Sequence, residues 1–413
     1  MHDSNSTSVH RVFLPDIVAE FSCAQCGECC NAWEIPVDRD SYDRAVAALG
    51  DEARENLEVV EPLSRAGYAR LKMHSGRCAF QTGPLCRIHR DHGDALLFPE
   101  CRKFPRVMFA TPVALHCTAS FACAKMLKSL DRPDCVRMLH LAPQMIAFRA
   151  DWCDTFIGEQ PCLCRGKAMT WDAFEAVENG FIEILRRPGR SLECRLLTMV
   201  EFVRSLARDC ESPLQKSTVD CELQTARVDA FQEWADRSLL AEHDAEGQVN
   251  VVLRLIAKKL KAGPMRAWER GPLEAAARRW GDGAAKGGPY LDDCRRAYLT
   301  ADARVRRILE NYTLCRVAGN PTFAIRDVEA GLCSVVALLA LVRAVAVATG
   351  LAAKDAADAP VHRLAAPPSP ITPEIALAAI RAVDTAFFHL PDFDELVRKC
   401  NAEPAALLIL TPG

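Results

Sequence analysis

The sequence lacks a strong net charge. Its 413 residues include 51 basic and 54 acidic side chains, so the formal net charge is −3. This balance excludes a strongly basic nucleic-acid-binding protein, and we expect no nucleic-acid partner. The composition, 50% hydrophobic and 25% charged, is typical of a globular protein. A chain of this length predicts two or three domains, at roughly 150 residues each.

Signals for export and membrane insertion are also lacking. Residues 1–9 are polar and show no basic segment followed by an apolar run, so we expect no secretory signal peptide. The most apolar stretch, residues 332–349, is barely long enough to span a bilayer and carries Arg343 near its middle. We therefore expect a buried core helix, no membrane span and a cytoplasmic location, where thiols stay reduced or bind metal.

Internal repeats and convincing strand patterns are scarce, whereas helical periodicity is common after residue 131. Apolar residues at helical spacing predict helices over residues 170–187, 191–206, 247–261, 292–315 and 328–349. Residues 351–373 are rich in Ala and Pro and predict a linker or exposed loop, after which Thr372 and Pro373 open a last helix. Any sheet should be short and near the cysteines.

These patterns predict a mainly α protein with two parts. The first, residues 1–130, is a small, irregular, metal-bound cysteine-rich domain, and the second, residues 131–413, is a larger helical domain. The Ala/Pro-rich loop near residues 351–373 interrupts the second part. The sequence leaves the oligomeric state open.

Cysteine is abundant and unevenly distributed. Thirteen of the 20 cysteines lie within residues 1–164, and seven are scattered over the remaining residues. An even distribution would indicate buried structural thiols. Clustering in a reducing compartment favours a metal site over disulfides.

The strongest motif is CxxCxxCC at residues 23–30. A two-residue spacer lets two thiolates turn toward one metal, and Gly27 permits the tight backbone that this requires. Further cysteines follow up to residue 117, and the candidate metal ligands are Cys23, Cys26, Cys29, Cys30, Cys78, Cys86, Cys101 and Cys117.

Eight thiols allow more than one kind of site. They could hold two zinc ions, or one iron–sulfur cluster with ligands left over. The side chains of adjacent Cys29 and Cys30 diverge and rarely reach one tetrahedral ion, which favours a polynuclear site. Residues 70–106 carry a net charge of +5, which would offset the negative charge of thiolate ligands. Arg102, next to Cys101, is the preferred candidate for this role.

The run from the CxxCGxCC motif to Cys117 resembles the cysteine-cluster proteins described as zinc- or iron-chelating domains. The resemblance covers roughly residues 21–125. Within it, the flanking segments are similar to those of flagellin lysine-N-methylases. The segments that carry this narrower resemblance are Cys29–Asp38, Cys78–Phe80, Leu85–Ile88, Cys101–Arg106 and Cys117.

The resemblance implies a protein-lysine N-methyltransferase that uses S-adenosylmethionine, contains an iron–sulfur cluster, of the [4Fe–4S] type, and acts on flagellin or a similar protein. No strand followed by a glycine-rich turn and a helix is evident, so the common way of binding such a cofactor is not expected. The glycines of residues 281–288 follow a helical pattern and predict a loop. An open iron site would then be the natural anchor for the amino-carboxylate of the cofactor.

Two other classes of function stay open at this point. A closed zinc or iron site could only stabilise a helical interaction module. Alternatively, the cluster could carry electrons in an iron–sulfur redox protein. Glu34, Asp38, Tyr42 and Tyr68 lie near the motif in sequence, but caps, surface charges and core aromatics are the simpler interpretation of them. No catalytic residue is therefore assigned.

Overall fold

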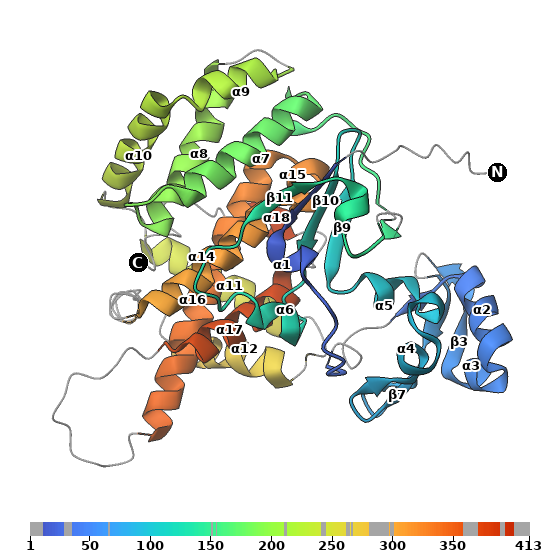
Figure 1. Cartoon of the computed structure of the whole chain (residues 1–413). Helices are drawn as coiled ribbons and strands as arrows, with labels where there is room; N and C mark the ends of the chain where they lie inside the picture. The colour runs from blue at the N-terminus through green and yellow to red at the C-terminus, as the bar shows by residue number, and fades with distance from the viewer. Residues whose placement is uncertain are drawn as a thin grey trace.

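The computed structural model describes residues 11–28, 35–64, 67–149, 152–153, 155–209, 213–240, 245–261, 265, 267–280, 297, 301–357, 371–388 and 393–399. Most of these residues lie in helices, and the strands are short and lie before residue 169. The predicted mainly α fold, with a small, irregular, cysteine-rich N-terminal part, is confirmed. Figure 1 shows a helical body and a smaller lobe, which stands at the right of the view.

The helical body begins at residue 171. Its helices are α7 (Trp171–Arg186), α8 (Leu192–Asp209), α9 (Lys216–Glu222), α10 (Thr225–Leu240), α11 (Ala245–Lys261), α12 (Ala267–Trp280), α14 (Ala303–Val317), α15 (Pro321–Ile325), α16 (Val328–Ala357), α17 (Pro373–Val383) and α18 (Phe393–Lys399). Helices α12, α16 and α17 all pack against one another. A π-helical turn, Asp384–Phe388, continues α17.

Side-chain caps fix the starts of three predicted helices. The hydroxyl of Thr170 accepts a hydrogen bond from the Ala173 N–H of α7, and Ser191 accepts one from the Cys194 N–H of α8, both at 3.2 Å. Thr372 caps α17 in the same way, with Pro373 at the first helical position. These caps satisfy backbone donors that a helix leaves unpaired at its start.

The predicted start of one helix and the predicted end of another differ from the structure. Helix α14 begins at Ala303, because the Asp302 side chain caps it through the Val305 N–H at 2.9 Å. Most of the earlier part of the predicted helix, residues 292–296 and 298–300, lies outside the described residues. Helix α16 continues to Ala357, into the predicted linker, because residues 351–357 (LAAKDAA) are mostly strong helix formers. The remainder of that linker, residues 358–370, lies outside the described residues.

The helix that begins at Pro373, α17, was predicted to be the last one in the chain. This prediction is wrong, because the short helix α18 follows it.

The apolar helix α16 is the interior helix of the body. Within it, Val328–Ala353 is long and apolar enough to cross a membrane, but 89% of its most apolar window is buried inside the protein. Arg343, the charge that interrupts it, forms a buried ion pair with Glu193 of α8. A charge inside a core needs such a partner.

A four-stranded sheet joins the N-terminus to the helical body. Its order is β11 (Met138–Leu141), β1 (Val12–Pro15), β10 (Leu115–Ala119) and β9 (Arg106–Ala110), with β1 parallel to β10. Strand β1 is fully buried, and the short helix α1 (Asp16–Ala19) follows it directly. The cysteine loop therefore starts from a segment that is anchored in the large core.

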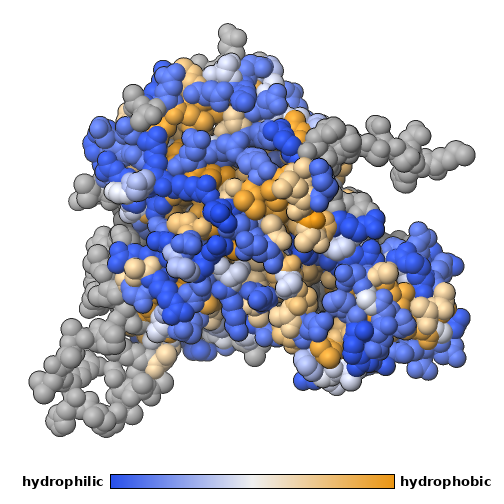
Figure 2. All heavy atoms as spheres, in the orientation of Figure 1, coloured by the Kyte–Doolittle hydropathy of each residue, from blue (hydrophilic) through white to orange (hydrophobic). Residues whose placement is uncertain are grey.

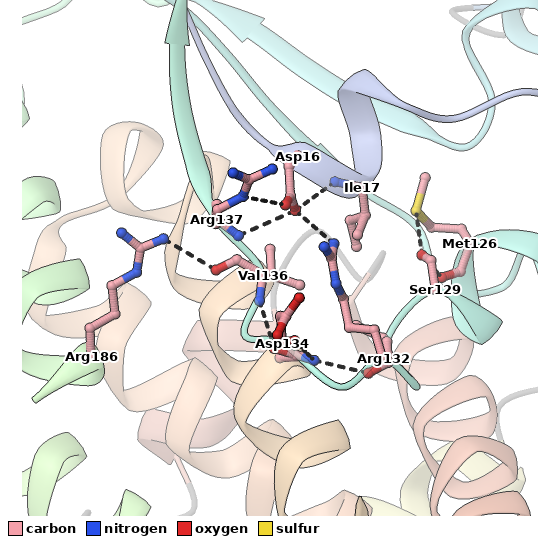
Figure 3. Close-up of polar contacts among 11 residues, drawn as sticks. Asp16, Ile17, Met126, Ser129, Arg132, Asp134, Val136, Arg137 and Arg186 are labelled. Atoms are coloured by element: carbon pink, nitrogen blue, oxygen red, sulfur yellow. Dashed lines mark hydrogen bonds and ion pairs between the residues drawn. The ribbon is translucent and has the colours of Figure 1, made fainter. Parts of the chain in front are cut away.

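Hydrogen bonds to Asp16 link β1 and α1 to the segment before β11 (Figure 3). Its carboxylate is buried and accepts hydrogen bonds from the Ile17 N–H at 2.9 Å and from Arg132 at 3.2 Å. Arg137 donates to it from both its backbone N–H and its Nε, each at 3.2 Å. Four donors and two cations compensate the cost of burying this carboxylate.

The smaller lobe is built from short elements around its own core. Its helices are α2 (Arg39–Leu49), α3 (Asp51–Asn56), α4 (Arg87–His92) and α5 (Pro99–Lys103), and its strands are β2 (Pro36–Val37), β3 (Leu57–Ser64), β4 (Gly67–Leu71), β5 (Met73–His74), β6 (Arg77–Cys78), β7 (Gln81–Thr82) and β8 (Leu85–Cys86). Strands β2, β4 and β3 form a three-stranded sheet, and two tight hairpins follow.

Burial divides the N-terminal part between two cores. Residues of the range 37–98 form the small core, whereas residues of 12–18 and 108–130 belong to the large core with the helices. Helix α6 (Ala124–Lys128) and the hairpin of β12 (Cys162–Cys164) and β13 (Lys167–Ala168) also lie with the body. The division at residue 130 stays a prediction.

Candidate metal centre

The cysteine loop, residues 21–28, makes a tight turn at Gly27. This glycine has a φ of +70°, a left-handed conformation that side chains disfavour. A Cβ at this position would lie 2.3 Å from Gln81 Nε2 and 2.6 Å from the Pro84 carbonyl oxygen. The Gln81 amide donates to the Gly27 carbonyl at 3.3 Å. The loop therefore lies directly against the β7–β8 hairpin, which ends in Cys86.

The backbone of the loop also turns toward its first thiol. The Gln25 N–H points at Cys23 Sγ at 3.3 Å, and Gln25 itself has a positive φ of 52°. Both Cys23 and Cys26 are exposed. A backbone donor to sulfur and a solvent-accessible pair of thiols suit a ligand loop better than a buried structural thiol.

Five cysteines from four separate segments line one cavity of about 330 Å³. They are Cys23 and Cys26 of the loop, Cys86 of β8, Cys101 of α5 and Cys123, which directly precedes α6. The four segments come from the small lobe and from the helical body. Tertiary structure thus gathers thiols that are up to a hundred residues apart in the sequence.

A second cavity of about 490 Å³ shares three of these thiols, Cys23, Cys86 and Cys101, and adds Cys78. Its wall is largely apolar and comes from the small lobe on one side and from β9 on the other. Figure 2 shows hydrophobic residues at the surface between the lobe and the helical body. Arg106 lines both cavities.

The eight predicted ligands therefore divide into four groups. Cys23, Cys26, Cys86 and Cys101 line the first cavity, and Cys78 lines only the second. Cys117 on β10 lines neither cavity and is fully buried in the large core, where burial raises the pKa of its thiol far above the ordinary value. Cys29 and Cys30 lie outside the described residues.

Cys123 was not among the predicted ligands. It occupies the N-cap position of α6 and lines the first cavity, six residues after Cys117. Cys123 stands directly before a helix, whereas Cys117 lies within strand β10, and no signal in the cysteine spacing distinguishes the two.

Two half-buried arginines supply positive charge beside the thiols. Arg102 donates to the Leu97 carbonyl at 2.8 Å, and Arg106 donates to the Phe21 carbonyl at 3.2 Å. The Nε atoms of both side chains are buried without a hydrogen-bond partner. Burial lowers the pKa of Arg106, while the nearby Cys117 opposes that shift. A guanidinium in this position can offset the charge of thiolate ligands.

The donor set suits a metal that prefers sulfur. Thiolates select zinc or iron–sulfur clusters over hard cations such as Mg²⁺ and Ca²⁺. Five thiols around one cavity and two cationic side chains beside it match that chemistry. Among the residues that the structure describes, no three Cys, His, Asp or Glu side chains are close enough together to hold an ion as they stand.

The acidic and aromatic residues near the motif have structural roles. Asp38 caps α2 through the Ser41 N–H at 2.8 Å, and the rings of Tyr42 and Tyr68 pack edge to face at 5.2 Å. Glu34 and the glycine-rich residues 281–288 lie outside the described residues.

Comparison with known proteins identifies the segment that carries this centre. Residues 22–154 match the family CxxCxxCC, whose description is "Putative zinc- or iron-chelating domain". No curated protein matches the chain, and no solved structure matches it. The matched segment contains every cysteine that lines the two cavities.

Proposed function

We propose that the zinc- or iron-chelating segment holds an iron–sulfur cluster, of the [4Fe–4S] type, in the first cavity, and that the protein is a lysine N-methyltransferase that uses S-adenosylmethionine. The observation that carries this proposal is the adjacency of the two cavities, which share three thiols. The order of motifs from Cys29 to Cys117, which resembles flagellin lysine-N-methylases, supports flagellin or a similar protein as the substrate.

The second cavity suits the cofactor. Ligand sites typically measure about 300–1,000 Å³ and combine apolar walls with a few polar groups. This cavity measures about 490 Å³ and has apolar walls, with Lys103 and Arg106 among its polar residues. A bound cluster with an open iron would hold the amino and carboxylate groups of the cofactor at the shared thiols. The two cationic residues would favour the carboxylate electrostatically.

Methyl transfer to lysine also needs a proton acceptor, because only the neutral ε-amine attacks the methyl carbon. The nitrogen–carbon bond forms as the sulfonium leaves as a neutral thioether, and the amine proton must pass to a base. Glu100 is the one carboxylate among the described residues that line the second cavity, and it pairs with Lys103 at 2.9 Å. We assign it as the proton acceptor.

The test is anaerobic purification followed by incubation with methyl-labelled S-adenosylmethionine and flagellin. We expect brown protein and label on flagellin lysines. Cys101→Ser should lose both colour and transfer, whereas Cys221→Ser, on the exposed surface of α9, should retain both. Glu100→Gln should keep the colour but lose transfer by about 10²-fold or more. Colourless protein with stoichiometric zinc would contradict the proposal.

A structural metal site is the second candidate, and the size of the small core favours it. Lobes of fewer than about 80 residues rarely bury enough apolar surface to be stable alone, and many of them use a metal. In that case the site holds zinc or iron only to stabilise the lobe, and the protein transfers no methyl group. Its helical body then serves to bind a partner.

A further inference from the structure

Arg381 of α17 contacts two cysteine-bearing segments at once. One of its terminal nitrogens forms an ion pair with Glu28 Oε2 at 2.6 Å. Its Nε donates to the Ala122 carbonyl at 3.1 Å. Glu28 lies between Cys26 and Cys29 of the motif, and Ala122 directly precedes Cys123. One guanidinium therefore joins the cysteine loop to the segment before α6.

The arginine is itself held rigidly. Its guanidinium carbon lies 4.2 Å from the centroid of the Trp268 ring on α12, and its side chain is only 15% exposed. Helices α12 and α17 pack against each other, and α17 also packs against α6. The planar guanidinium presents its donors in a fixed fork, so it sets the relative position of both partners, which a lysine would not do.

The Gln81 contact holds the same loop from the opposite side. The Gln81 amide ties Gly27 to the hairpin of Cys86, and Arg381 ties Glu28 to the helical body. The cysteine loop thus lies between two anchors from different parts of the fold. Only the second of these anchors also reaches the Cys123 segment.

We infer that Arg381 is a positioning residue of the metal centre. It fixes Cys23, Cys26 and Cys123 around the first cavity and adds a positive charge near their thiolates. Retention of the metal therefore depends on the helical body, far outside the matched chelating segment. Residues that orient metal ligands typically change metal affinity by 10–100-fold when they are replaced.

The first experiment compares metal release. Full-length protein is loaded anaerobically with zinc, or with iron and sulfide, and its metal is then competed away by a chromogenic chelator. Arg381→Ala should release metal about 10-fold faster than the wild type. The matched control is Arg187→Ala, which removes an ion pair with Asp229 at 2.7 Å on the helical body, remote from the cysteine loop. It should release metal at the wild-type rate.

Two further variants separate positioning from folding. Glu28→Gln removes the charge of a half-exposed side chain and should also accelerate release, and Arg381→Lys should restore only part of the retention because it lacks the fork. The double variant of Glu28→Gln and Arg381→Ala should release metal no faster than Arg381→Ala. Wild-type release rates in folded Arg381→Ala would overturn the inference. If that variant fails to fold, wild-type release from Glu28→Gln overturns it.

Thermodynamic linkage between metal binding and the docking of α17 provides a second test. A contact that only stabilises the fold would not give this linkage. If Arg381 helps the metal to bind, then metal must strengthen the docking of α17 by the same free energy. Metal loading should slow hydrogen exchange at the amides of α17 in the wild type, but not in Arg381→Ala. Equal slowing in both proteins would count against the inference. Failure of the wild type to bind any metal would instead refute the metal centre itself.

Discussion

At the scale of single residues, Gly27 determines how closely the cysteine loop approaches the β7–β8 hairpin. Its positive φ and the short distances to Gln81 and Pro84 leave no room for a side chain. We expect Gly27→Ala to displace the loop and to lower metal affinity by about 10-fold or more. Metal titration against a competing chelator measures this affinity.

The control for this substitution is Gly83→Ala in the neighbouring hairpin. Gly83 also has a positive φ, of 61°, but a Cβ there would meet nothing within 4 Å. Both variants carry the same unfavourable backbone conformation, and only Gly27→Ala adds the steric conflict. Equal metal affinity of the two variants would show that close approach of the loop is unimportant.

The exposure of individual thiols leads to a second prediction. Cys23, Cys26 and Cys221 are exposed, whereas Cys117 and Cys315 are buried, and burial raises the pKa of Cys315 to about 12. Without metal at pH 8, iodoacetamide should label the three exposed residues and leave the two buried thiols, which stay protonated, unlabelled.

Metal loading should then protect Cys23 and Cys26 by about 10-fold or more, because a coordinated thiolate is not available as a nucleophile. Cys221 on α9 serves as the internal control and should be labelled equally in both states. Peptide mass spectrometry reads each site separately. Unchanged labelling of Cys23 and Cys26 in metal-loaded protein would exclude them as ligands.

Four of the five thiols that line the first cavity could be predicted from the sequence. The CxxC spacing and the further cysteines that follow it indicate Cys23, Cys26, Cys86 and Cys101, and all four line that cavity. Cys117 and Cys123 could not be told apart by spacing. The distinction depends on which of them lies inside a buried strand and which begins a helix, and long-range strand pairing decides that.

At the scale of secondary-structure elements, the Asp16 cluster joins β1 and α1 to the segment before β11. Removing this carboxylate leaves Arg132 and the backbone donors without their acceptor. We expect Asp16→Ala to lower the free energy of unfolding by about 1–3 kcal/mol, because buried donors lose their acceptor while the two arginines keep access to solvent. Denaturant unfolding followed by circular dichroism measures it.

The control is Asp43→Ala, which removes an exposed ion pair with Arg39 on α2. Exposed pairs contribute only about 0.2–1 kcal/mol, so this variant should unfold almost like the wild type. Similar effects of the two substitutions would mean that the Asp16 cluster does not anchor β1.

Element starts were easier to predict than element ends. Thr170, Ser191 and Thr372 are local signals, because a cap bonds to a backbone N–H two or three residues away. The continuation of α16 to Ala357 was missed because its Ala-rich end resembles a linker in composition. Whether such residues extend a helix depends on the packing of that helix, which composition does not report.

At the scale of the whole molecule, two cores of unequal size lie on either side of the cavities. The small core consists of residues between Val37 and Phe98, and the large core runs through the helical body. We expect removal of the metal to destabilise the small lobe more than the interior helix α16, since a metal bound only by the folded state stabilises that state by its binding free energy.

Thermal unfolding of loaded and chelated protein tests this expectation. Chelation should lower the melting temperature of the protein. It should also speed hydrogen exchange in α2 and β4 of the lobe and leave exchange in α16 nearly unchanged. The Cys221→Ser variant should respond to chelation as the wild type does. Uniform destabilisation of both cores would indicate that they unfold as one unit.

The sequence by itself determined the metal-binding chemistry, the helical body and the burial of α16. Each follows from a local pattern: the cysteine spacing, the 3.6-residue apolar period, and an apolar run that contains one charge. These patterns involve residues that are near one another in the chain. For the same reason these patterns indicate which ligand chemistry is present, but they do not indicate which residues come together to form the site.

Only the tertiary structure decided which thiols face one cavity and which residues hold them there. Strand β1 pairs with β10 across about a hundred residues, and Arg381 reaches Glu28 from the opposite end of the chain. Such contacts depend on the packing of both cores together. No local pattern encodes them, because the sequence separation of two residues does not determine their distance once the chain is folded.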